Sequence, residues 1–239
     1  MNHLEKFESE SANKTLKVKE IFFDFEGTVV DFQWKLIPAV EECLTALDKV
    51  GFNPDLYGTD PSYAHIYNHT LELARQGKVS GDPPSAMAII DRIYDKYDTD
   101  ALTRWNLYPD TLSVIETLRE KGFRMGIISN IGRESLQTAM DRLGLSGRLE
   151  VVISRDDVEQ LKPHPEGLIR AAKTLNVDPA QTIFIGDSLN DVGAARGAGM
   201  LAGFIRGGQD SPETMARLPA DLEIDNLTQL AASLTRIAD

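Results

Sequence analysis

Several polar residues of this sequence stand directly beside apolar runs, where a packed core would not place them. The candidates are Asp24, Glu26, Ser129, Asn130, Lys162, Asp187 and Asp191. Asp24 and Glu26 end a run rich in Val, Ile and Phe, and Gly27 and Thr28 break that run. Burying a carboxylate is costly unless it is paired or bound to a metal ion. These positions therefore indicate chemistry rather than packing.

The residue types match the needs of phosphoryl chemistry. The carboxylates of Asp24, Asp187 and Asp191 are hard oxygen ligands of the kind that suits Mg²⁺, which also binds substrate phosphate. Ser129 and Lys162 can donate hydrogen bonds to phosphate oxygens. A carboxylate beside a cation can attack phosphorus and form an aspartyl-phosphate. A second carboxylate can protonate the leaving alkoxide and then deprotonate water. The set fits a Mg²⁺-dependent hydrolase of phosphate monoesters.

The remaining pattern supplies elements that could hold these groups together. Apolar runs predict strands at 17–25, 123–129, 149–153, 182–185, 201–205 and 222–224. Helices are predicted at 109–121, 133–143, 165–175, 188–198 and 227–237. This alternation implies an α/β fold with a doubly wound parallel sheet, covered on both faces. Because ligands bind outside the carboxyl ends of such strands, we expect the candidates to converge at one edge of the sheet.

The segment between the first strand and residue 109 has a helical rather than an alternating strand–helix pattern. Apolar residues recur at helical spacing from Leu36 to Leu47, and Gly51 follows as a stop signal. Further helices are predicted at 63–76 and 84–97, and no strong strand signal interrupts them. We therefore predict an all-helical insert placed after the first strand.

These patterns divide the chain into an interrupted core and an insert. Residues 17–33 and 109–239 are predicted to form an α/β core domain, and residues 34–108 a helical cap domain. Residues 1–16 are polar and aperiodic, so they are interpreted as a frayed or disordered extension.

The composition narrows the class of protein. The chain has 239 residues, a formal net charge of −12 and a pI of about 4.8, which argues against a nucleic-acid partner. Its single cysteine, Cys43, excludes an intrachain disulfide and suggests a reducing cytoplasm. No signal peptide is evident, and no apolar run approaches the ~20 residues of a membrane span. We expect a cytoplasmic monomer or homodimer that acts on a small phosphorylated metabolite.

Four segments together resemble the motifs of the haloacid dehalogenase-like superfamily of phosphohydrolases. In chain order they are Asp24 to Asp31, Ile128 to Asn130, Lys162 to Glu166 and Gly186 to Met200. Their order and spacing are similar to the family pattern over nearly all of residues 19 to 205. The insert resembles the helical cap of the phosphoglycolate phosphatase-like branch. The resemblance implies a Rossmann-like core, a cap and phosphatase activity.

The resemblance also implies roles for the four acids. Asp24 would be the nucleophile and a metal ligand. Glu26 would be the general acid/base, and its backbone carbonyl would also reach the metal. Asp187 would bind Mg²⁺ directly, and Asp191 directly or through water.

For the phosphoryl group, the family pattern implies a cradle formed by Ser129, Asn130 and Lys162. Thr28 would orient the loop around the acid/base. One position departs from the pattern, because most phosphatases of the family have Asp where this chain has Glu26. The extra methylene changes the reach of the acid, although the enolase-phosphatase branch also resembles this chain in having Glu there.

Other interpretations stay open at this stage. A haloacid dehalogenase would need no metal and usually lacks the acid at Glu26. A phosphoryl mutase would return the phosphoryl group to substrate, and a non-catalytic member would only bind a phosphorylated ligand. Locally, Ser129 could simply cap a helix, and Lys162 could pair on the surface with Asp156 or Asp157.

Overall fold

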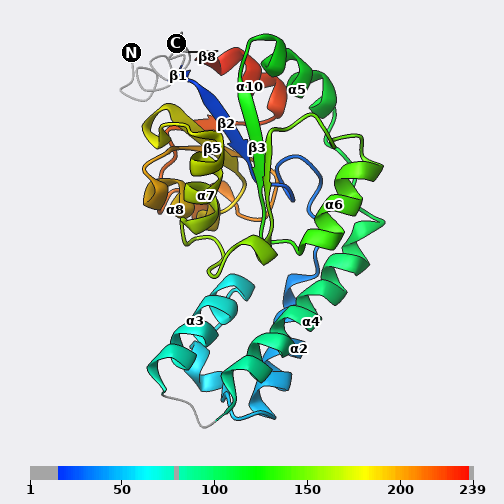
Figure 1. Cartoon of the computed structure of the whole chain (residues 1–239), viewed down its shortest axis with the longest axis vertical. Coiled ribbons are helices and arrows are strands. Elements are labelled where there is room, and N and C mark those ends of the chain that lie inside the picture. The colour runs from blue at the N-terminus through cyan, green and yellow to red at the C-terminus, as the bar shows by residue number, and fades with distance from the viewer. Residues whose placement is uncertain (1–15, 78–80, 237–239) are drawn as a thin grey trace, which may run out of the picture.

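The computed structural model of this chain describes residues 16–77 and 81–236. Its centre is a six-stranded parallel sheet in the order β4-β3-β2-β5-β6-β7. The strands are β2 (Glu20–Phe23), β3 (Arg124–Ile128), β4 (Val151–Ile153), β5 (Thr182–Gly186), β6 (Leu201–Ile205) and β7 (Leu222–Ile224). The sequence prediction of a doubly wound α/β fold is confirmed, and β2, the strand before Asp24, lies in the middle of the sheet (Figure 1).

Helices cover both faces of the sheet. They are α5 (Thr111–Glu120), α6 (Arg133–Arg142), α7 (Glu166–Leu175), α8 (Leu189–Ala198), α9 (Pro212–Met215) and α10 (Leu227–Ser233). Along β2, Ile21 and Phe23 pack into the same hydrophobic cluster as α5, α6 and α10, whereas Phe22 packs with α7 and α8. This alternation follows from the two-residue period of a strand, and it explains why β2 is apolar throughout.

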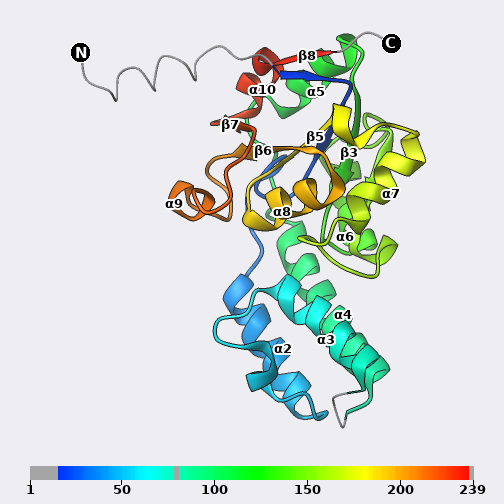
Figure 2. The ribbon, with the colours of Figure 1, turned by 90° about the vertical axis from the view of Figure 1, so that its left-hand side faces the viewer.

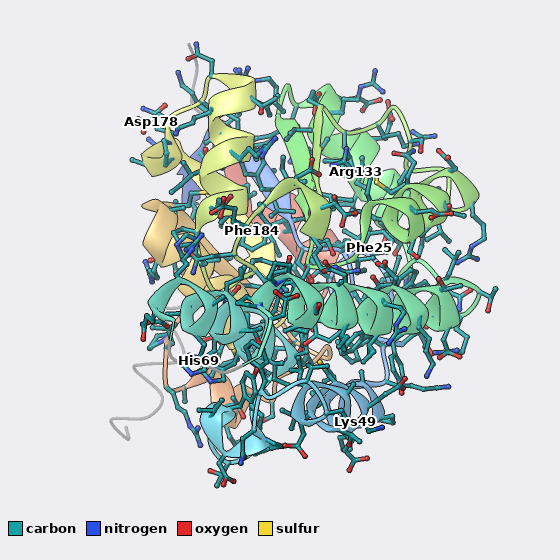
Figure 3. All side chains as sticks on the ribbon, turned by 60° about the horizontal axis from the view of Figure 1, so that its bottom comes forward. Phe25, Lys49, His69, Arg133, Asp178 and Phe184 are labelled. Atoms are coloured by element: carbon teal, nitrogen blue, oxygen red, sulfur yellow. The ribbon has the colours of Figure 1, made fainter. Side chains whose placement is uncertain are left out.

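Three long helices form the inserted cap at one end of the molecule (Figures 1 and 2). They are α2 (Leu36–Asp48), α3 (Tyr63–Gln76) and α4 (Pro83–Leu102), with a short 3₁₀ turn, η1 (Pro54–Tyr57). Ser62 caps α3 by accepting from the His65 amide, and Asp82 caps α4 by accepting from the Ser85 amide. Viewed from the cap end, α4 crosses in front of the core, with Lys49 and His69 on the cap and Arg133 and Asp178 on the core (Figure 3).

The third cap helix is longer than predicted. The sequence predicted 84–97, but α4 continues to Leu102. Buried residues recur through this extra turn at Tyr97, Asp98 and Ala101. An aspartate in the buried stripe hid the continuation of the apolar period, and the structure shows that its carboxylate is fully hydrogen bonded.

Both ends of the described chain differ from the prediction. The strand predicted at 17–25 is two strands, β1 (Leu16–Val18) and β2. The final helix ends at Ser233, and Leu234–Arg236 form β8, which pairs in parallel with β1. Leu16 is therefore in a strand, and the rest of the predicted N-terminal extension lies outside the described residues. The two-stranded sheet lies at the end of the core far from the cap (Figure 2).

Candidate active site

The predicted residues follow the ends of neighbouring strands at the carboxyl edge of the sheet. The Asp24 amide donates to the Ile185 carbonyl of β5 at 2.8 Å, and the Ser129 amide donates to the Ile153 carbonyl of β4 at 2.9 Å. These bonds continue the sheet ladder one residue past β2 and β3. The side chains that follow therefore project from neighbouring strands at the carboxyl edge of the sheet, as the topology predicts.

A buried acid cluster with one lysine occupies this edge. Carboxylate oxygens of Asp24, Asp187 and Asp191 lie within 4.8 Å of one another, and all three residues are buried. Lys162 Nζ donates to Asp24 Oδ1 at 2.5 Å and to Asp191 Oδ1 at 2.7 Å. Lys162 is itself 5 % exposed, so the alternative of a surface lysine paired with Asp156 or Asp157 is wrong.

The charges of this cluster do not balance. Three carboxylates face one ammonium, which leaves a formal charge of −2 in a buried site. Burial raises the pKa of Asp24 to about 6 even though Lys162 opposes the rise. Burial, with the neighbouring charges of Asp191 and Asp24, also raises the pKa of Asp187 well above its ordinary value. Oxygen donors that lack a counter-charge fit a divalent cation such as Mg²⁺.

Asp187 is fixed by close backbone rather than by its helix. A Cβ built on either Gly27 or Gly208 would lie 2.0 Å from Asp187 Oδ2, so both positions need glycine. The Gln209 amide donates to the same oxygen. The carboxylate is thus wedged between two loops. Asp187 is not the helix cap, because Ser188 is the N-cap of α8.

Asp191 connects the start of α8 to the lysine. Its Oδ1 accepts from Lys162, whereas its Oδ2 accepts from the Ser188 hydroxyl at 2.6 Å and the Ser188 amide at 3.1 Å. Ser188 in turn accepts from the Asp191 amide, which completes a capping box. Both carboxylate oxygens of Asp191 already accept protein donors, so Asp24 and Asp187 are the more available cation ligands.

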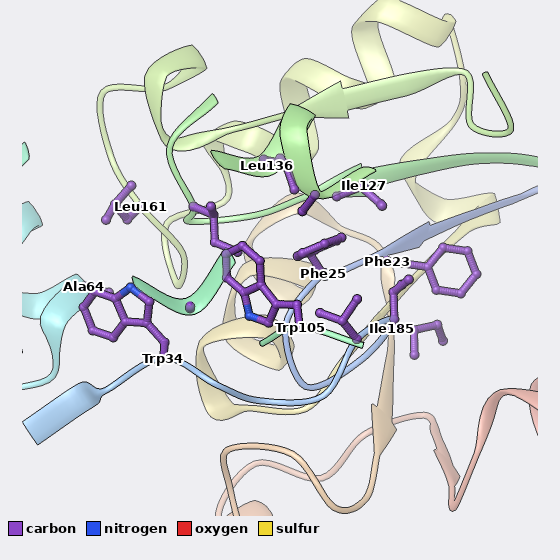
Figure 4. Packing of buried hydrophobic residues seen from close by; sticks show 14 of the residues in the cluster. Phe23, Phe25, Trp34, Ala64, Trp105, Ile127, Leu136, Leu161 and Ile185 are labelled. Carbon is purple, nitrogen blue, oxygen red and sulfur yellow. The ribbon is translucent and has the colours of Figure 1, made fainter. Parts of the chain in front are cut away.

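Glu26 lines the same pocket as the acid cluster and is held by the two segments that carry the cap. Its Oε1 accepts from the amides of Gln33 and Trp34 at 2.6 Å each and from Trp105 Nε1 at 2.7 Å. Trp34 and Trp105 flank the site from opposite linkers, and Trp105 packs edge-on against Phe25 with ring centroids 5.5 Å apart (Figure 4). The extra methylene of Glu26 therefore places its carboxylate within reach of three hydrogen-bond donors.

The surroundings of Glu26 tune its acidity. Burial raises its pKa to about 7, with the hydrogen bonds from Trp105, Gln33 and Trp34 opposing that rise. A carboxyl group that titrates near neutral pH can give a proton in one step and take one in the next. Asp24 differs from Glu26 in its partner, because Asp24 bonds the ammonium of Lys162.

The predicted phosphate cradle is partly occupied by structural bonds. The Ser129 hydroxyl accepts from the Ile131 amide at 3.3 Å. The Asn130 side chain donates to the Tyr63 hydroxyl at 3.0 Å, and its Oδ1 accepts from the Lys162 amide at 3.1 Å. Asn130 therefore holds the lysine segment and a cap residue together. The alternative of Ser129 as a helix cap is wrong, because Gly132 precedes α6.

Thr28 does not orient the acid/base loop through its hydroxyl. Within the described residues, its buried Oγ1 has no hydrogen-bond partner. The turn after Asp24 is instead closed by the backbone, because the Gly27 amide donates to the Val30 carbonyl at 2.7 Å. Gly27 adopts a φ of 79°, which favours glycine in addition to the contact with Asp187.

A pocket lies between these groups and the cap. Its floor is the acid cluster, and its walls include Phe32, Trp34, Tyr63 and Ile131. Sequence reasoning missed Trp34, Trp105, Tyr63 and Gln209, because each is brought in by a linker, the cap or a loop without a local motif. The two tryptophans were the available signal, since they stand near the two ends of the predicted insert.

The parallel sheet, the helical insert after its central strand and the acid–lysine cluster at the carboxyl edge define a capped α/β enzyme. The model of one family, the haloacid dehalogenase-like hydrolases, matches residues 18–199. The chain belongs to this family. The resemblance described from the sequence is therefore confirmed, together with the Rossmann-like core and inserted cap.

Curated relatives and solved structures agree with this assignment. A phosphoglycolate phosphatase of Cupriavidus necator is 32% identical over 230 residues, covering 94% of this chain and 96% of the relative. The phosphoglycolate phosphatase of Escherichia coli is 29% identical over 203 residues, covering 78% and 81%. A hydrolase from Pseudomonas syringae superposes with a TM-score of 0.68 at 20% identity, covering 90% of this chain and 96% of that one. The last comparison supports the fold alone. Among the described residues, each helix is too short or too polar to cross a membrane.

Proposed function

We propose that this chain is a Mg²⁺-dependent phosphatase that hydrolyses a small phosphorylated metabolite through an aspartyl-phosphate on Asp24. The observation that carries the proposal is the buried site itself: Asp24 bonds Lys162 beside Asp187 and Asp191, and burial raises the pKa of the nearby Glu26 to about 7. Asp24 is suited to attack phosphorus, and Glu26 to move a proton.

In the first step, a carboxylate oxygen of Asp24 attacks phosphorus. The bond from phosphorus to the ester oxygen breaks, and protonated Glu26 gives its proton to the departing alkoxide. Lys162 holds the nucleophile in place and offsets negative charge on the phosphoryl oxygens. The Ser129 hydroxyl stands at the neighbouring strand end, where it can donate to one of these oxygens.

In the second step, the ionised Glu26 removes a proton from water as that water attacks phosphorus. The bond from phosphorus to the Asp24 oxygen breaks, and inorganic phosphate and the free carboxylate are restored. Mg²⁺ bound by Asp24 and Asp187, with Asp191 alongside and the Glu26 carbonyl as the family suggests, would supply positive charge against the dianionic phosphoryl group. That charge also compensates the net −2 of the buried cluster.

Because the curated relatives are phosphoglycolate phosphatases, 2-phosphoglycolate is the first compound to test. A cytoplasmic location and a monomeric or homodimeric state stay predictions, as do the bounds of the cap at residues 34 and 108.

The test is hydrolysis of p-nitrophenyl phosphate and 2-phosphoglycolate, with and without Mg²⁺, by the native chain and Asp24→Asn. We expect Mg²⁺-dependent turnover that disappears in the variant. Acid-quenched native enzyme should carry a phosphoryl group on the peptide that contains Asp24. Asp48→Asn, at the exposed end of α2, is the matched control and should behave as native. Unchanged turnover in Asp24→Asn, or turnover without any phosphoenzyme, would refute the mechanism.

A further inference from the structure

Asp98 of α4 joins the cap, one linker and the core at a single carboxylate. Its Oδ1 accepts from Trp34 Nε1 at 2.9 Å, and its Oδ2 accepts from the Gly132 amide and from Arg155 Nη1, both at 2.9 Å. Asp98 is 1 % exposed and Arg155 2 % exposed. A buried ion pair of this kind is strongly coupled, because removing one partner leaves the other charge unpaired.

The core side of this junction is shaped to receive α4. Arg155 lies between the cap and the loop after β3: it also binds Asp95 of α4 and the Asn130 carbonyl, and it stacks over the Tyr94 ring at 5.7 Å. A Cβ on Gly132 would lie 2.7 Å from Arg155 Nη2 and 3.3 Å from Asp98 Oδ2. The close approach of helix and loop therefore depends on glycine at this position.

Trp34 connects the junction to the acid/base. Its indole is held by Asp98, and its backbone amide donates to Glu26 Oε1 at 2.6 Å. The second linker reinforces the arrangement, because Trp105 Nε1 also donates to Glu26 and Arg104 donates to the Gln33 carbonyl at 3.0 Å. The carboxylate of Glu26 is thus held by the same two linkers whose geometry sets the position of the cap.

We propose that Asp98 and Trp34 are positioning residues for the acid/base: the Asp98–Arg155 ion pair fastens the cap to the core and, through Trp34, fixes the Glu26 carboxyl where it can reach the leaving group. The inference rests on the proposed function for Glu26. It adds that protonation of the leaving group depends on the hydrogen bond between Asp98 and Trp34, which lies outside the acid cluster.

Leaving-group dependence separates positioning from general damage. Phenyl phosphate releases a phenol with a pKa of about 10 and needs a proton, whereas p-nitrophenyl phosphate releases a much more acidic phenol and needs it less. Values of kcat/KM report the step in which the phenol departs. We expect Asp98→Asn and Trp34→Phe to lower kcat/KM for phenyl phosphate by about tenfold more than for p-nitrophenyl phosphate. The double variant should lose little more kcat/KM than either single variant, because both substitutions remove the hydrogen bond between Trp34 and Asp98.

Glu42→Gln is the matched control. It removes a carboxylate that pairs with Lys96 of α4, but this pair lies within the cap and does not reach the core. The control should keep the native ratio between the two esters. An equal loss on both esters in Asp98→Asn and Trp34→Phe would overturn the inference, and so would a native ratio in both variants.

A second readout does not depend on catalysis. Trp34 and Trp105 are the two tryptophans of the chain, so intrinsic fluorescence reports on this junction directly. Asp98→Asn should shift the emission maximum to longer wavelength, and Glu42→Gln should not. If the native chain hydrolysed neither ester, the proposed function would fail, and the emission shift would still decide whether Asp98 fastens the linker. An unchanged emission maximum in Asp98→Asn would overturn that part as well.

Discussion

Replacing Lys162 by methionine tests the electrostatics of the acid cluster most directly. Lys162→Met keeps the length and apolar stem of the side chain but removes the ammonium that bonds Asp24 and Asp191. Breaking a buried pair by removing one partner costs about 3–5 kcal/mol, and here two carboxylates lose the same partner. We therefore expect the free energy of unfolding at pH 8, without metal, to fall by at least about 3 kcal/mol.

The loss should depend on pH with a definite sign. Burial already raises the pKa of Asp24 to about 6, and losing Lys162 raises it further. A carboxyl group whose pKa is higher in the folded state than in the unfolded state destabilises the fold as pH rises between the two values. The variant should therefore be closest to native near pH 5, where Asp24 is protonated, and furthest from it at pH 8.

Chemical denaturation at pH 5 and pH 8, with and without Mg²⁺, measures both effects. Mg²⁺ at about 100 times its dissociation constant should return about 2.7 kcal/mol to either chain, because it binds only the folded site. Lys96→Met is the control, since the Lys96–Glu42 pair is exposed and should contribute little to stability. A loss in Lys162→Met below about 1 kcal/mol at pH 8, or one independent of pH, would refute the account of the cluster.

Three further predictions follow from the same site. Glu26→Gln should be more stable than the native chain at pH 8 by roughly 2–3 kcal/mol, because ionising a group with a raised pKa opposes folding. Near pH 4 the two chains should be equally stable, and melting temperatures at the two pH values check this. Trp105→Phe should lower kcat by at least about tenfold with little change in KM, because Glu26 loses a donor worth about 1.5–3 kcal/mol; steady-state kinetics would contradict it if KM alone rose. Asp187→Asn should raise the Mg²⁺ concentration for half-maximal activity by at least about tenfold, which a metal titration measures. The same change should stabilise the metal-free chain, because it relieves repulsion with Asp24 and Asp191, and an unfolding curve measures this effect.

The sequence was sufficient for the sheet and for its reactive edge. Strands with near-continuous apolar runs and helices ended by glycines have local signals, and parallel topology then forces the strand ends to one side. Asp24, Lys162, Asp187 and Asp191 could therefore be grouped from the sequence alone. Their detailed bonds could not, because nothing local indicates that Asp191 serves the lysine as well as the helix cap.

Features that depend on distant partners were missed. The strand Leu234–Arg236 continues a helical pattern in sequence, and only its pairing with β1 makes it extended. From the sequence, Asp98 resembles a solvated helix residue. Its partner Arg155 lies more than fifty positions later, and the two pair where the cap contacts the core. Trp105 gives no motif, yet its indole completes the cradle of Glu26. In each case tertiary contact overrides the local preference.

The central place of β2 in the sheet has a consequence for how the chain acquires its structure. β2 is the first strand of the main sheet in the sequence, but it pairs with β3 and β5, both more than a hundred residues later. Pairings of such long range close large loops and slow folding, whereas α2, α3 and α4 make contacts within one segment. During synthesis at ~5–20 residues per second, the cap can therefore assemble while β2 still awaits both neighbours. Asp24, directly after β2, would reach its place in the site late, after the cap helices have formed.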